Sequence, residues 1–99
     1  MFTVISHFKV MPGWREKVEQ AFLNRPHLVE QADGFIRIDV LQKQDDPDQF
    51  WLYTQWRDET SYEIWHKSHQ YQESHSHIPE GLKLQGAFTD IKKFTHLCS

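Results

Sequence analysis

The residues with the most chemical potential lie in one polar segment, from Trp65 to His75. The segment begins with an indole ring and continues with several imidazoles. A neutral imidazole is a common ligand of transition metals and exchanges protons near neutral pH. An indole offers a flat apolar surface to a planar molecule or to a protein core. The pattern therefore indicates a site for a flat or metal-containing ligand, and the competing interpretation is a buried tryptophan beside surface histidines.

A dedicated metal site explains this segment less well. His66 and His69 can share one side of a helix, and His75 and His77 follow closely. No cysteine lies nearby, however, and the neighbouring glutamates fall into no recognised metal-binding motif. A helix surface rich in histidine accounts for the spacing better.

Composition excludes several classes of function. The 99 residues predict a single domain, 1–99, and 14 acidic against 11 basic residues form no basic stripe for nucleic acid. No apolar run is long enough to span a membrane, and no secretory signal begins the chain, so we expect a cytoplasmic protein. The single cysteine, Cys98, cannot form an internal disulfide. Motifs typical of hydrolases and of nucleotide-binding loops are also missing from the sequence.

The elements around the segment follow from hydrophobic periodicity and from the turn residues. A helix is expected from Trp14, with Pro26 opening a short second helix that reaches Gln31. Asp58 is a plausible N-cap for the helix that carries Trp65, and Ser68 for a further helical turn that carries His75. Four strands are predicted: Phe2 to Met11, Phe35 to Gln42, Phe50 to Trp56, and about Leu84 to His96.

Alternation within the strands predicts which side chains share a face. In the first strand Ser6, Phe8 and Val10 lie on one face and His7 on the other. In the second strand the residues expected on one side are Ile36, Ile38 and Val40.

The element order is therefore β-α-β-β-α-β, a ferredoxin-like split β-α-β fold of the α+β class. Such a fold has a four-stranded antiparallel sheet with its helices on one face. The second face includes Ile5 and Met11, and in so short a chain the natural cover is a second copy. We therefore expect a homodimer.

This order of elements, with Trp65, a capping Ser68 and then His75, resembles the antibiotic-biosynthesis monooxygenase family. The resemblance covers nearly the whole chain and is closest to the heme-degrading branch. It implies a dimeric α+β barrel with each pocket between the helices and their own sheet. It also implies heme as both cofactor and substrate, and an external electron donor.

The resemblance assigns roles to particular residues. His75 would bind the heme iron, Trp65 would distort the porphyrin and act in catalysis, and Phe8 and Phe22 would line the pocket. Ser6, which would face the ligand as a catalytic residue, departs from the family pattern, because heme-degrading members have an asparagine there. A serine hydroxyl donates one hydrogen bond and is shorter than an asparagine amide.

Two alternatives remain open at this stage. Other branches of the family oxidise quinols or polyphenols without a cofactor, and His75, His69 or Tyr71 would then serve as the base. The second alternative is a non-catalytic dimer that binds heme. Ser6 in place of the family asparagine would then be the reason for the lack of catalysis.

Overall fold

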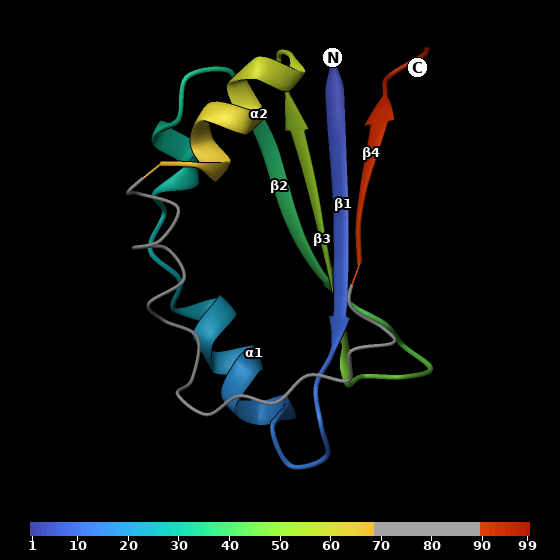
Figure 1. Ribbon diagram of the computed structural model, residues 1–99. Helices are drawn as coiled ribbons and strands as arrows, with labels where there is room; N and C mark the ends of the chain where they lie inside the picture. The colour runs from blue at the N-terminus through green and yellow to red at the C-terminus, as the bar shows by residue number, and fades with distance from the viewer. Residues whose placement is uncertain (69–89) are drawn as a thin grey trace.

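A four-stranded antiparallel sheet forms the centre of the computed structural model, which describes residues 1–68 and 90–99. The strand order is β2-β3-β1-β4 (Figure 1). The strands are β1 (Phe2–Lys9), β2 (Phe35–Gln42), β3 (Gln49–Trp56) and β4 (Asp90–Thr95). This arrangement confirms the predicted ferredoxin-like α+β fold with its antiparallel β2-β3 hairpin.

The described helices lie on one side of this sheet, with α2 near one end of the strands and α1 near the other (Figure 1). They are α1 (Arg15–Leu23), the 3₁₀ helix η1 (Val29–Gln31) and α2 (Glu59–His66). Helix α1 confirms the predicted helix after Trp14, and η1 confirms the short helix that ends at Gln31. Within the described residues no helix has the length and apolar character needed to cross a membrane.

The N-terminus of α2 is fixed by the predicted Asp58 cap. Asp58 Oδ1 accepts hydrogen bonds from the Ser61 backbone N–H at 2.8 Å and from the Ser61 hydroxyl at 2.7 Å. The turn before β2 comes close to the same serine. Gly34 has φ +83°, and a Cβ added there would lie 2.2 Å from Ser61 Oγ. Glycine is needed at this position because both the backbone conformation and the contact exclude a side chain.

The start of β2 departs from simple alternation, because its pairing with β3 is irregular between Phe35 and Arg37. Phe35 takes a core position, with its ring edge-on to Trp56 at 5.5 Å, and Ile36 is 46% exposed. Ile38 and Val40 share a side as predicted, since they are opposite Thr54 and Leu52, two residues apart on β3. For Ile36 the common side stays a prediction.

Strand β1 ends at Lys9, short of the predicted Met11. Val10 continues as a single bridge residue and donates its N–H to the Asp48 carbonyl. The start of the last predicted segment and the helical turn expected after Ser68 lie outside the described residues.

The core divides into two clusters on the helix side of the sheet. The α2 cluster consists of Val4, Val29, Trp56, Tyr62 and Trp65. The α1 cluster consists of Val10, Val18 and Phe50, with Phe8, Trp14 and Phe22 packed against it. The clusters lie toward opposite ends of the strands because each helix covers only one end.

Candidate functional site

A row of four residues crosses the sheet between the two clusters. Ser6 on β1 is opposite Leu52 on β3 and Ile91 on β4, and Leu52 is opposite Val40 on β2. Strand alternation directs this Ser6 row to the helix side, because Val4 and Phe8, two residues before and after Ser6, pack there. Among the described residues, neither cluster includes a member of the row. Among the described residues, the row therefore separates the two clusters.

The Ser6 row is an apolar strip with one polar group. Ser6, Leu52 and Val40 are each partly buried, and Ile91 is 52% exposed. The Ser6 hydroxyl can donate one hydrogen bond and accept others, whereas its three neighbours offer only apolar surface. Such a strip suits a flat apolar ligand that is oriented by a single hydrogen bond.

Aromatic rings border the row on the α1 side. The Phe8 ring lies 6.1 Å from that of Phe22 and 5.7 Å from that of Phe50, measured between centroids, and the Phe22 and Phe50 rings are also 5.7 Å apart. Phe8 and Phe22, two residues expected at a pocket, are thus brought together next to Ser6. Their position matches a lining role, and their contact with a ligand stays a prediction.

Trp65 lies on the opposite side of the Ser6 row, in the α2 cluster. Its side chain is 7% exposed and shares this cluster with Val4 and Trp56. The structure therefore supports the packing role that sequence alone also allowed for Trp65. Its proposed action on a bound ligand remains to be tested.

A cationic side chain lies one row away from Ser6. Lys93 on β4 is opposite Val4 and contacts α2 through Glu63 at 2.9 Å and Glu59 at 3.7 Å. The hydrogen bond to Glu63 raises the pKa of Lys93, and the same bond is the main cause that lowers the pKa of Glu63. This group attaches β4 to α2 beside the row and balances the charge of Lys93 with two carboxylates.

The histidine and tyrosine candidates cannot be placed in the same way. His75, proposed as the iron ligand, lies outside the described residues together with His69, Tyr71 and His77. In the part of the chain that is described, no three His, Cys, Asp or Glu side chains are grouped so as to hold a metal ion. The roles of these residues therefore stay predictions.

Sequence reasoning missed three of the four residues in the row: Val40, Leu52 and Ile91. Each is an ordinary apolar strand residue with no motif around it. The signal that identifies them is the cross-strand register with Ser6, which the sequence does not show.

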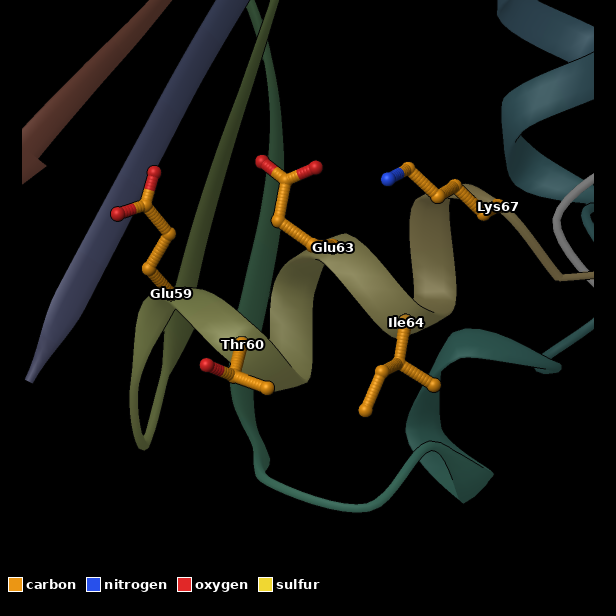
Figure 2. A pocket seen from close by; sticks show the side chains of 5 residues that line it. All are labelled: Glu59, Thr60, Glu63, Ile64 and Lys67. Carbon is orange, nitrogen blue, oxygen red and sulfur yellow. The ribbon is translucent and has the colours of Figure 1, made fainter.

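A concavity lies on the outer surface of α2, away from the Ser6 row. It encloses about 350 Å³, and its lining residues are Glu59, Thr60, Glu63, Ile64 and Lys67. Figure 2 shows Glu59, Glu63 and Lys67 projecting from one side of the helix and Thr60 and Ile64 from another. Because one helix supplies the whole lining and its side chains diverge, this hollow has no opposing wall to enclose a ligand.

Solved structures share this fold over nearly their full length. A candidate antibiotic biosynthesis monooxygenase from Nitrosomonas europaea superposes with a TM-score of 0.79 at 18% identity, covering 99% of this chain and 100% of that one. An MhuD variant superposes with a TM-score of 0.82 at 17% identity, covering 100% of this chain and 97% of that one. SnoaB, a cofactor-independent oxygenase from Streptomyces nogalater, superposes with a TM-score of 0.77 at 16% identity. The match covers 99% of this chain and 94% of that one. Similarity at these identities establishes the fold.

The element order and the antiparallel sheet define a small ferredoxin-like α+β domain. The model of the family described as antibiotic biosynthesis monooxygenase matches residues 1–76. The chain belongs to this monooxygenase family.

Proposed function

We propose that this protein is a monooxygenase that binds heme on the Ser6 row and degrades it oxidatively, releasing the iron. The observation that carries the proposal is the row itself, an apolar strip interrupted by one hydroxyl in the middle of an otherwise packed sheet face. Three strand spacings separate β2 from β4, so the row extends about 14 Å. A strip of this length and apolar character fits one face of a porphyrin.

The residues around the row have distinct tasks in this proposal. Phe8 and Phe22 bury one edge of the porphyrin, and Trp65 supports the opposite side from within the α2 cluster. Ser6 orients the reacting side of the ligand with its hydroxyl. His75 holds the iron through a neutral imidazole nitrogen. When bound and supplied with electrons by an external donor, heme provides the means of activating oxygen for oxidation of its own ring.

The fold-level comparison is compatible with this ligand. The MhuD variant is a structure with two manganese protoporphyrin IX molecules bound per active site, which shows that a protein of this fold accommodates a porphyrin. The similarity adds to the proposal only at the level of the fold, because 17% identity does not carry a function across.

A second candidate is a cofactor-independent oxidation of a quinol or polyphenol. The uncharged Ser6 row also suits a neutral aromatic substrate, and SnoaB is a cofactor-independent oxygenase with this fold. Such a reaction needs a base to remove a phenolic proton, and the Ser6 row offers only a serine and three aliphatic side chains. The base would have to be His69, Tyr71 or His75. We place heme first because heme needs no protein base to be oxidised.

A hemin titration followed in the Soret band tests the proposal. We expect saturable binding by the wild type, loss of most affinity in His75→Ala, and little change in the matched control His77→Ala. Ascorbate is then added to the bound form with catalase present. A Soret band that decays in step with iron release supports heme degradation.

Other outcomes of this titration contradict the proposal in different ways. Stable binding of heme without decay of the Soret band would show that the protein is a non-catalytic heme-binding protein. The absence of saturable binding would reject heme as the ligand, and quinol oxidation measured by oxygen uptake would then be the next assay.

A further inference from the structure

The Ser6 row has an open end at β4, which is an edge strand of the sheet. All residues of β4 are exposed, and Ile91, the member of the row on this strand, is 52% exposed. Ser6, Leu52 and Val40 are more deeply buried along the rest of the row. A planar ligand on the row would therefore keep the edge that lies over β4 in contact with water. We expect the polar groups of the ligand at that edge, because burying them on the apolar part of the strip costs free energy.

A cation lies on the helix side of the sheet beside this open end. Lys93 follows Ile91 by two residues on β4, so alternation places both side chains on the same face. Two residues of an extended strand span about 7 Å, a distance that a lysine side chain can bridge. The other lysine and arginine residues of the described strands, Lys9, Arg37 and Lys92, lie on the opposite face. Among these strand cations, Lys93 is therefore the one that a ligand on the row can meet.

The ammonium group of Lys93 contacts α2 and keeps hydrogen-bonding capacity. Its Nζ donates to Glu63 Oε1 at 2.9 Å and lies 3.7 Å from Glu59 Oε2, which is too far for a hydrogen bond. The same nitrogen lies 5.9 Å from the centroid of the Tyr62 ring. An ammonium group has three N–H donors, and among the described residues Lys93 uses one of them, for Glu63. Lys93 can therefore donate to a further carboxylate without leaving Glu63.

The charges around Lys93 allow a further carboxylate to approach. The hydrogen bond from Lys93 lowers the pKa of Glu63, and the charge of Lys67 lowers it further. Glu59, Glu63 and Lys67 project from one side of α2 (Figure 2). Together with Lys93 they form a group of two cations and two anions, which has no net charge. An acid group on a ligand would therefore meet a hydrogen-bond donor without a net repulsive charge.

We propose that Lys93 binds a carboxylate on the periphery of the ligand, and that the site thereby selects flat apolar molecules with an acid group at one edge. This assignment rests on the proposed function, since heme is such a molecule, with propionate side chains on one edge of its ring. It also gives the ligand one orientation, in which the acid edge faces solvent over β4 and the apolar edge lies toward β2. A quinol without an acid group would gain no charge-assisted hydrogen bond from Lys93.

Titrations of hemin and of hemin dimethyl ester, whose propionates are uncharged, test the assignment when both are followed in the Soret band. We expect the wild type to bind hemin more tightly than the ester in the same buffer. Lys93→Gln should raise the dissociation constant of hemin by about fivefold or more and that of the ester by less than about twofold, because only hemin loses a charge-assisted hydrogen bond.

The matched control is Lys92→Gln. Lys92 is the preceding residue of β4, and it is opposite Ile5 on the other face, where it pairs with Asp90 at 3.6 Å. Its replacement makes the same change in net charge and should leave both dissociation constants unaltered. Circular dichroism confirms that each variant is folded.

A double variant separates direct contact from the electric field of Glu63. Lys93→Gln leaves Glu63 without its hydrogen-bonded cation, and this negative charge alone would weaken the binding of an acid. Lys93→Gln combined with Glu63→Gln removes that charge and has the net charge of the wild type. We expect the double variant still to bind hemin more weakly than the wild type and to keep its affinity for the ester.

The outcomes separate this assignment from the proposed function. Hemin binding by Lys93→Gln as tight as by the wild type, or an equal loss for hemin and its ester, would reject Lys93 as the acid-binding residue and leave heme as the ligand. Wild-type affinity for hemin in the double variant would also reject direct contact. Absence of saturable hemin binding by the wild type would instead overturn the proposed function, and this assignment with it.

Discussion

The two faces of the sheet are built from the same four strands and have different organisations. On the helix side, alternate residues pack into two clusters and leave the Ser6 row between them. The opposite sheet face points away from the described helices and is called the helix-free face (Figure 1). There the rings of His7 and Trp51 are stacked, and apolar and charged side chains lie around them. Ser6 and His7 are adjacent in sequence and belong to different faces. Strand alternation thus separates the proposed ligand site from this second face by one peptide unit.

The largest expected effect comes from truncating one tryptophan on each face of β3. Trp56 is 1% exposed on the helix side, so Trp56→Ala should lower the free energy of unfolding by about 3–5 kcal/mol. Trp51→Ala removes a partly exposed ring and should cost less than about 2 kcal/mol. Urea denaturation at one fixed protein concentration measures both losses. Equal losses would show that the two faces are not distinct in packing.

The next effect concerns neighbouring residues of β1. Ser6→Asn places a longer hydrogen-bond donor in the proposed site, and we expect the rate of hemin decay under ascorbate to rise by about tenfold or more. His7→Asn makes the same side chain on the helix-free face and should leave that rate unchanged. The measurement is the initial rate of Soret loss at saturating hemin. An equal change in the decay rate in both variants would show that the Ser6 face is not the one on which heme is degraded.

The smallest effect is a pH dependence of the attachment of α2. Hydrogen bonds from the Ser61 hydroxyl and backbone N–H lower the pKa of Asp58 below its ordinary value of 3.8. The carboxylate therefore stabilises the fold above that pH, and this stabilisation is lost as the pH falls through the lowered pKa. In Asp58→Asn the amide oxygen still accepts a bond but does not titrate. The urea midpoint of this variant should fall less than that of wild type between about pH 5 and about pH 3. An equal fall in both proteins would exclude Asp58 as a source of acid sensitivity.

The features of the fold that sequence predicted are those set by local chemistry. The alternation of β1 placed Ser6 and Phe8 on one face correctly, because a period of two is a property of the strand itself. The Asp58 cap was also predicted, since its partner Ser61 is only three residues away. The bulge at Ile36 was not predicted. Phe35 and Ile36 are both apolar, and only packing against Trp56 decides which of them takes the core position.

The candidate site shows the same division. Ser6, Phe8 and Phe22 were proposed from their place in the pattern, and the structure brings them to one region. Leu52 and Ile91 complete the row only through cross-strand register, which depends on tertiary pairing. The His7–Trp51 stack escaped sequence reasoning for the same reason, since the two residues are distant in sequence and meet only across the β1-β3 pair.

The most direct measurement of the central claim is a crystal structure of the protein with ferric protoporphyrin bound. The account predicts that the porphyrin lies on the Ser6 row between the two clusters, with His75 on the iron. A porphyrin bound on the outer hollow of α2, or on the helix-free face, would contradict the assignment of the ligand site to the Ser6 row.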